Sequence, residues 1–184
     1  LVQDAQDQLG EIEEVVISIP ANFSNEAREA TLRAGDLAGL KVNFIVNEPT
    51  AAALYYSFLN QEALDGIYAV YDLGGGTFDF SVIEVKDNEV NVLNSDGIQK
   101  CGGDDFDRLL YDIIVDKYYE KTQDEINDLD FNLTHAEKAK RSLTSKEKAL
   151  VKVGKEIIEI TREEFNEAIS SLVLQTKVTV EKTI

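Results

Sequence analysis

The strongest chemical signal in the sequence is a run of three glycines between two apolar stretches. The run reads Asp72-Leu73-Gly74-Gly75-Gly76-Thr77-Phe78-Asp79. Three successive glycines cost backbone entropy on folding, so some requirement should hold them there. Without side chains, their N–H groups can surround a phosphate. Asp72, at the end of an apolar strand, can hold a magnesium ion directly or through water. The Thr77 hydroxyl can reach a terminal phosphate or its attacking water.

Two familiar phosphate-binding motifs do not fit this glycine run. No Gly-Lys-Ser/Thr follows it, as a Walker loop requires. In the dinucleotide fingerprint the third glycine would fall at Asp79, and a helix rather than a strand should follow. A β-hairpin turn with Asp-Gly chemistry explains the same residues without any ligand. Taken alone, the run leaves phosphate binding and a plain turn equally open.

The flanking sequence predicts an α/β pattern in its first third. A buried strand ends at Pro20, and Ser24 caps a helix that stops near Gly39. A second strand leads into an Asn47-Glu48-Pro49-Thr50 turn that opens another helix. The predicted elements here are strands 14–19 and 42–46, helix 24–39, and a second helix that Pro49 or Thr50 opens and that runs through 51–59.

The remaining sequence predicts a meander of strands followed by helices and a hairpin. Asp87-Asn88 is the expected turn within the meander, and Gly154-Lys155 is the expected hairpin turn. Thr161 and Glu164 form a capping box for the last helix. The predicted elements are strands 67–71, 78–85 and 89–94, helices 104–121 and 134–146, and a final helix after residue 161.

Composition restricts the classes of partner. With 35 acidic and 18 basic residues, the formal net charge is −17. A chain this acidic repels nucleic acid and anionic membranes, so neither is expected as a partner. Cys101 is the only cysteine and His135 the only histidine, which fits a reducing cytoplasm and excludes a histidine-rich metal site. There is no signal peptide or membrane-spanning run, and a chain starting at Leu1 is expected to be part of a longer protein.

Several motifs, in order along the chain, resemble the ATPase domain of the DnaK-type (seventy-kilodalton heat-shock) chaperone family. The glycine run resembles the second phosphate loop of the actin, sugar-kinase and heat-shock superfamily. The segments that single out the heat-shock branch are Pro20-Ala21-x-Phe23 with Arg28, Asn47-Glu48-Pro49-Thr50-Ala51-Ala52-Ala53, Gly102-Gly103-Asp104-Asp105-Phe106-Asp107, and Glu137-Lys138-Ala139-Lys140-Arg141-Ser142-Leu143.

The resemblance implies roles for individual residues. Asp72 would support magnesium through water, and Gly74, Gly75, Gly76 and Thr77 would hold the β- and γ-phosphates of ATP or ADP. Glu48 would lie near the metal and the hydrolytic water, with Asp79 behind the loop. The remaining implied residues are Gly103, Glu137, Lys140, Arg141 and Thr144 for the nucleotide, and Pro20 and Arg28 for an interlobe relay.

The proposed adenosine helix also has support from its spacing. Glu137, Lys140, Arg141 and Thr144 follow at i, i+3, i+4 and i+7, which is one helical face. A carboxylate can accept from ribose hydroxyls, and a guanidinium can stack on adenine. For the segment taken alone, a solvated helix with a Glu137–Arg141 pair is the better explanation, and only the family resemblance reverses that order. The helix dipole alone explains the acidic residues at the start of the predicted helix 104–121, Asp104, Asp105 and Asp107, without a metal. We interpret Cys101 as a small loop residue rather than a reactive thiol.

The implied architecture is a partial actin-like, ribonuclease-H-like α/β ATPase fold, with part of the first lobe and most of the second. The expected division is a β-α-β-α layer over residues 1–62, a meander with the phosphate loop over 63–101, and helices with an outer subdomain over 102–184. Thr144 stands where the family usually has serine, and the stretch 145–161 is short. Some specialised bacterial members, including the iron–sulfur-assembly type, share this short tip.

The resemblance implies a longer protein that couples ATP hydrolysis to the binding of unfolded peptides, which a domain absent here would hold. A J-domain co-chaperone and a nucleotide-exchange factor would assist it. A first phosphate loop and a catalytic lysine have no counterpart, so this chain is expected to bind nucleotide weakly and to be inactive alone. A sugar-kinase-like enzyme and a non-catalytic interaction lobe are the alternatives. Strand 14–19 is expected to expose an edge that self-associates, or to follow a disordered start. Replacing Pro20 or Arg28 is expected to leave the fold and affinity of this chain nearly unchanged.

Overall fold

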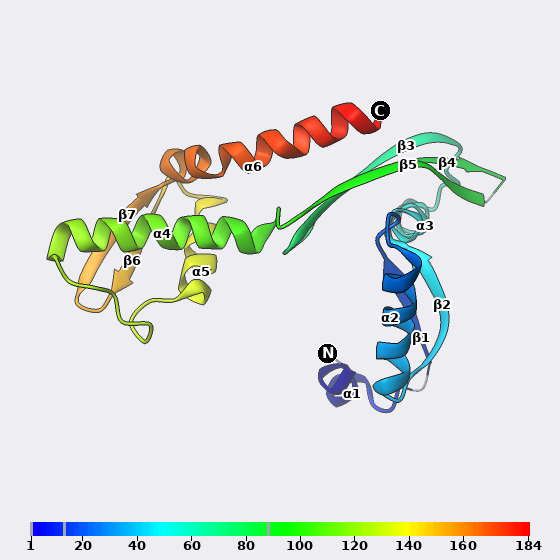
Figure 1. Cartoon of the computed structure of the whole chain (residues 1–184), viewed down its shortest axis with the longest axis horizontal. Coiled ribbons are helices and arrows are strands. Elements are labelled where there is room, and N and C mark those ends of the chain that lie inside the picture. Colours follow the sequence, from blue (N-terminus) through cyan, green and yellow to red (C-terminus); the bar gives the residue numbers. More distant parts are fainter. Residues whose placement is uncertain (1, 13, 88) are drawn as a thin grey trace. The chain divides into compact units, whose positions relative to one another are not determined.

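The computed structural model describes residues 2–12, 14–87 and 89–184. Their contacts form two compact units: residues 2–71, 79–97 and 183–184 make the first, and 72–78 with 98–182 the second. The elements, labelled in Figure 1, are α1 (Val2–Leu9), β1 (Glu14–Ile19), α2 (Asn25–Leu37), β2 (Lys41–Asn47), α3 (Glu48–Asn60), β3 (Gly66–Leu73), β4 (Thr77–Lys86), β5 (Glu89–Gln99), α4 (Gly103–Thr122), α5 (Leu133–Leu143), β6 (Lys148–Val153), β7 (Glu156–Thr161) and α6 (Arg162–Thr183).

The first unit begins with a β-α-β layer. β1 and β2 pair in parallel, and α2 connects them and packs against β2. The Ser24 side chain accepts a hydrogen bond from Ala27 N–H at 3.3 Å, which confirms the predicted N-cap. Gly39, at φ +76°, ends α2 in the left-handed conformation that glycine adopts freely. The α/β class is therefore confirmed.

The start of α3 differs from the prediction. Residues Glu48 to Thr50 are already helical and directly follow β2, so there is no separate Asn47–Thr50 turn and the helix begins slightly before the predicted start at Pro49 or Thr50. Pro49 lies in the first helical turn, where its missing N–H leaves no helical hydrogen bond unmade. The next three strands form a sheet in the order β3-β4-β5, as a meander requires. The predicted turn at Asp87-Asn88 includes Asn88, which lies outside the described residues.

The second unit has the larger core. The β6–β7 hairpin and α5 pack with α4, as Figure 1 shows, and their inward residues form one apolar cluster. α5 ends at Leu143, earlier than the predicted residue 146. Fully buried members of the cluster are Leu110, Ile114, Phe131, Ala136 and Ile160.

The first turn of α6 carries the predicted capping box. Thr161 N–H donates to Glu164 Oε2 at 2.8 Å, and Glu164 N–H donates to Thr161 Oγ1 at 3.2 Å. Glu164 also pairs with Lys117 of α4. Burial raises the pKa of the Glu164 carboxyl, but the bonds from Lys117 and Thr161 outweigh that effect and hold the pKa below its usual value.

This lowered pKa predicts an acid-sensitive contact between α6 and α4. A carboxyl whose pKa is depressed by folding stabilises the protein above its unfolded pKa of about 4.5, and the benefit is lost as pH falls through the lower folded value. We expect the thermal midpoint of the wild-type chain to fall more steeply below pH 4.5 than that of Glu164→Gln. Parallel melting curves of the two proteins from pH 7 to pH 3 would contradict this contribution.

Two expectations about the chain's first residues have different outcomes. Residues Val2–Leu9 form helix α1, so the alternative expectation of a disordered start before residue 14 was wrong. β1 pairs with β2 alone in a two-stranded sheet within the described residues, so the predicted self-association through its other edge stays a prediction. The division at residues 62 and 101 also stays a prediction. No helix in the described part combines the length and the apolar character that crossing a membrane requires.

Candidate functional site

The three-glycine loop lies between β3 and β4 and is held through its carbonyl groups. Gly74 N–H donates to Thr77 O at 2.9 Å and closes the turn. The loop carbonyls accept from the segment before α4 and its first turn: Gly103 N–H reaches Gly74 O at 3.0 Å, Asp104 N–H reaches Gly75 O at 2.7 Å, and Lys100 N–H reaches Gly76 O at 3.1 Å.

This arrangement fixes the carbonyl groups of the loop but leaves some of its backbone N–H groups without an acceptor in the described part of the chain. Within the described residues, no acceptor engages the N–H groups of Gly75 or Gly76. Neighbouring N–H groups without a protein partner are what an anion can occupy. Both glycines are exposed, so water satisfies these donors in a plain hairpin turn, whereas in a phosphate loop an anion takes the place of that water.

Gly102 is the closest neighbour of the loop. A Cβ added to it would lie 2.4 Å from Gly75 O and 2.7 Å from Gly74 O, both backbone atoms. Only a residue without a side chain permits this approach. Gly103, the residue named by the sequence analysis, donates its N–H to Gly74 instead. Both glycines therefore place the N-terminus of α4 against the loop.

The acidic residues at the start of α4 have separate structural roles. Asp105 Oδ2 accepts from Gly102 N–H at 3.1 Å, which caps the helix. The Asp104 carboxylate lies beside Gly75, with Oδ1 3.7 Å from the position of an added Cβ. The helix dipole alone, which the sequence analysis invoked, does not account for these contacts.

Asp107 forms the link that sequence reasoning missed. Its side chain is almost entirely buried, and Lys140 Nζ of α5 lies 2.9 Å from Asp107 Oδ1. The same ammonium donates to Gly103 O at 2.9 Å. Lys140 thus joins α5 to the residue whose N–H holds Gly74. A signal was available: Asp107, Leu110 and Ile114 share one helical face, so a carboxylate there requires a buried partner.

The other predicted nucleoside residues lie along α5 and its end. Arg141 Nε pairs with Glu137 Oε1 at 3.3 Å, and the Arg141 side chain is 78% exposed. Thr144 is the C-cap of α5 and is exposed. Of the four predicted residues on this face, the structure brings Lys140 to the α4–loop junction, whereas Glu137 and Arg141 pair with each other.

The predicted catalytic residues belong to different units. Asp72 ends β3 beside the loop in the second unit and is exposed. In the first unit, Glu48 opens α3 and Asp79 lies in β4, where Asp79 Oδ1 accepts from Asn22 Nδ2 at 3.3 Å. Thr77 begins β4 at the loop and is exposed.

A magnesium ion fits this site in only one of its usual modes. The described residues hold no group of three or more His, Cys, Asp or Glu side chains able to bind a metal. Magnesium is often held by one or two carboxylates together with substrate phosphates. Asp72, at the start of the loop, is consistent with that mode. The described residues are not consistent with a metal site made of protein ligands alone.

Cys101 is buried just before this junction. Its thiol lies 3.8 Å from Leu172 O, and burial, with a smaller contribution from the Asp105 carboxylate, raises its pKa. A raised pKa keeps the thiol protonated and unreactive, in agreement with its interpretation as a small loop residue.

Arg28 has structural partners in the first unit. Its guanidinium donates to Phe23 O at 3.3 Å, to Ala21 O at 3.3 Å and to Asn47 Oδ1 at 3.2 Å. These bonds tie the loop that follows Pro20 to the end of β2. The expectation that Arg28 can be replaced without affecting the fold is therefore revised.

We expect Arg28→Ala to lower the free energy of unfolding by about 1–3 kcal/mol, because hydrogen bonds to a charged donor are lost together. Arg28→Lys, which keeps the charge but not the planar fork, should recover less than half of this loss. Denaturant melts of the three proteins provide the measurement. Equal midpoints for wild type and Arg28→Ala would show that these bonds add no net stability.

Comparison with known proteins covers the whole chain. The sequence model described as "Hsp70 protein" matches residues 1–184. The chain belongs to the Hsp70 family. A protein called "Chaperone protein dnaK" from Phaeodactylum tricornutum is 40% identical over 199 aligned residues, which cover 100% of this chain and 32% of that protein. A "Chaperone protein HscA homolog" from Haemophilus influenzae is 42% identical over 170 residues, covering 92% of this chain and 27% of that protein.

The match confirms the family suggested by the sequence motifs. Another protein called "Chaperone protein HscA homolog", from Histophilus somni, is 39% identical across 95% of this chain and 28% of its own length. This Hsp70 chain thus spans about a third or less of the curated relatives that it matches. Both dnaK and HscA names occur among them, so the branch of the family stays open.

Proposed function

We propose that this chain forms part of the ATPase domain of an Hsp70 chaperone, with the actin-like fold, and provides one side of an ATP or ADP site. The observation that carries the proposal is the glycine loop: its carbonyls are held by the start of α4, while the N–H groups of Gly75 and Gly76 have no acceptor among the described residues. Two oriented donors next to a helix N-terminus favour phosphate.

The residues around the loop would divide the binding work. Gly74, Gly75, Gly76 and Thr77 would contact the β- and γ-phosphates, with Gly102 and Gly103 fixing the loop from behind. Glu137, Arg141 and Thr144 would contact ribose and base once the exposed Glu137–Arg141 pair opens, which costs little at a solvated surface.

Lys140 would contribute both to the phosphate loop and to the nucleoside site. An ammonium has three N–H donors, and in this structure it contacts Gly103 O and Asp107. An N–H that Gly103 O does not use could reach a ribose hydroxyl. The proposal therefore gives Lys140 a positioning role at the loop in addition to the nucleoside contact implied by the family.

Magnesium, when bound with ATP, would neutralise phosphate charge near Asp72. The need for such a cation follows from the surroundings, since the Asp104 carboxylate lies beside Gly75 and the chain carries a net charge of −17. Glu48 would orient the attacking water, and Asp79 would support the loop from β4. In the whole protein, ATP hydrolysis would be coupled to binding of unfolded peptides, with Pro20 and Arg28 in the relay and a J-domain co-chaperone and an exchange factor as partners.

The test is calorimetry of the 184-residue chain with Mg-ATP and Mg-ADP. We expect weak binding and hydrolysis at the background rate, because each missing charge-assisted hydrogen bond removes about 1.5–3 kcal/mol, a tenfold or larger loss of affinity. Asp72→Asn should weaken binding only when magnesium is present, and Arg141→Ala should weaken it with or without the metal.

Lys86→Gln provides a control outside the site, at the end of β4. It should leave the affinity unchanged. Nanomolar binding, or turnover that Asp72→Asn abolishes, would show that the chain carries a complete site. Binding unaffected by both Asp72→Asn and Arg141→Ala would contradict the proposed location.

A further inference from the structure

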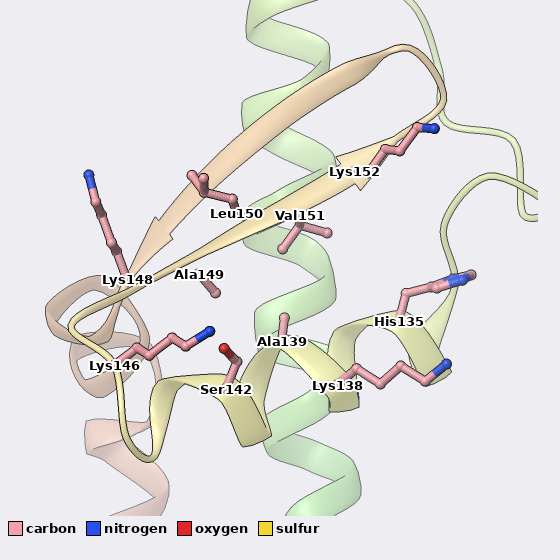
Figure 2. A pocket seen from close by; sticks show the side chains of 10 residues that line it. All are labelled: His135, Lys138, Ala139, Ser142, Lys146, Lys148, Ala149, Leu150, Val151 and Lys152. Atoms are coloured by element: carbon pink, nitrogen blue, oxygen red, sulfur yellow. The ribbon is translucent and has the colours of Figure 1, made fainter.

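A hollow of about 550 Å³ lies between α5 and β6, away from the glycine loop, and Figure 2 shows the side chains around it. Four lysines line it: Lys138 on α5, Lys146 in the connection, and Lys148 and Lys152 on β6. Apolar atoms of Leu150 and Val151 also reach its surface. We call this feature the α5–β6 hollow.

The charge around the hollow is opposite to that of the chain. Residues 133–153 contain six basic and two acidic residues, a net charge of +4 in a chain of −17. Local fields of one sign attract ligands of the other. A cationic surface within an acidic chain therefore favours an anionic occupant that touches this surface alone.

The amines of the hollow have few partners in the protein. Within the part of the chain that the structure describes, Lys138, Lys146 and Lys152 make no ion pair, and Lys148 pairs with Glu159 at 2.8 Å. The two acidic residues of this segment are already engaged: Glu137 pairs with Arg141, and Glu147 pairs with Arg162. Three ammonium groups thus remain available to a ligand.

The hollow also runs along an unpaired strand edge. β6 pairs with β7 over all six residues in a two-stranded sheet, and Figure 2 shows β6 between β7 and α5. The edge of β6 that faces α5 has no strand partner among the described residues. Such an edge offers main-chain donors and acceptors to an added strand.

The side chains of β6 specify what such a strand should carry. Lys148, Leu150 and Lys152 lie on the exposed face, alternating with the buried Ala149, Val151 and Val153. Neighbouring strands place like positions side by side. An added strand would meet lysine, leucine and lysine at every second residue.

We propose that the α5–β6 hollow binds an extended acidic segment of a partner protein, added as a strand to β6, with the pattern acidic–x–apolar–x–acidic. The two acidic residues face Lys152 and Lys148, which shares its ammonium with Glu159, and the apolar residue lies on Leu150. Lys138 and Lys146 contribute further attraction for the flanking acidic groups. This surface is independent of the proposed nucleotide site.

The probe is a fluorescent twelve-residue peptide with the core Glu-Thr-Leu-Thr-Glu, titrated with the full chain and followed by anisotropy. Its matched control has the core Thr-Glu-Leu-Glu-Thr, which keeps the composition but moves both acidic groups to the other face of the strand. We expect the first peptide to bind at least tenfold more tightly, its affinity to fall with added salt, and its binding to slow amide exchange in β6.

Two triple variants of the protein distinguish the effect of the lysines in the hollow from the effect of the chain's overall charge. Lys138→Gln/Lys146→Gln/Lys152→Gln should weaken binding about tenfold, because each exposed pair contributes up to about 1 kcal/mol. The equally charged Lys86→Gln/Lys100→Gln/Lys182→Gln should change it less than twofold. None of the six lysines takes part in an ion pair within the described residues.

Three results would overturn the proposal. Equal affinity for the two peptides would show that the peptide does not bind as an added strand. Displacement of the peptide by millimolar inorganic phosphate would indicate a simple anion pocket. If neither peptide binds and the triple lysine variant of the hollow self-associates, the lysines protect an exposed edge from pairing.

Discussion

Gly102→Ala is expected to disrupt the glycine loop and to lower the stability of the second unit by about 3 kcal/mol. The added Cβ would lie 2.4 Å from Gly75 O and 2.6 Å from Gly75 C, distances that real contacts do not reach. Those atoms belong to backbone, so no side chain can rotate away, and overpacking of this kind costs about 1–3 kcal/mol or more. The loop or the start of α4 must move.

The displaced loop should also lose nucleotide. If moving Gly75 removes one hydrogen bond to a phosphate, the affinity should fall about tenfold or more. Amide hydrogen exchange gives the local readout, because Gly74, Gly103 and Asp104 N–H groups are bonded in this junction. Their exchange should accelerate in the variant.

Gly76→Ala is the matched control for stability. A Cβ at Gly76 meets no atom within 4 Å, so its thermal midpoint should stay close to that of the wild type. If Gly102→Ala melts at the same temperature as Gly76→Ala and exchanges normally at Gly74, the close approach of Gly102 does not hold the loop.

Local signals in the sequence were sufficient for both ends of α2, the capping box of α6 and the glycine loop, but not for the end of α5. Ser24, Gly39 and the Thr161–Glu164 box act within a few residues of their own position, so spacing alone identifies them. The glycine run was likewise visible because three glycines in succession need a reason. The start of α3 was predicted at Pro49 or Thr50, close to its observed start at Glu48, because proline fits the first turn of a helix.

Contacts between distant residues could not be predicted in the same way. Lys140 and Asp107 are 33 positions apart, and only the packing of α5 on α4 brings them together. In the first unit, the packing of α2 on β2 likewise brings Arg28 to Asn47. Motif resemblance named Lys140 and Arg28 but assigned them to a ligand and a relay, because a motif records which residues occur together and not what each one touches.

The pair between Asp107 and Lys140 provides the second large expected effect. With side chains 11% and 21% exposed, respectively, the pair is mostly removed from water. Removing one partner leaves the other charge buried without a counter-charge. Asp107→Ala should therefore lower the free energy of unfolding by about 3 kcal/mol. The double variant Asp107→Leu/Lys140→Met replaces the pair with apolar side chains and should restore most of that stability. Chemical denaturation of the single and double variants measures both effects.

Nucleotide binding by the stable double variant then separates two roles of Lys140. If the ammonium acts chiefly by anchoring Gly103, and through it Gly74, the double variant should lose about tenfold in affinity for ADP and much less for adenosine, which has no phosphate. If it acts as a ribose ligand, both compounds should lose equally. The hydrogen bond to Gly103 O and the ion pair with Asp107, which already engage Lys140 Nζ, favour the first outcome. Unchanged affinity for both compounds would show that the pair serves the fold alone.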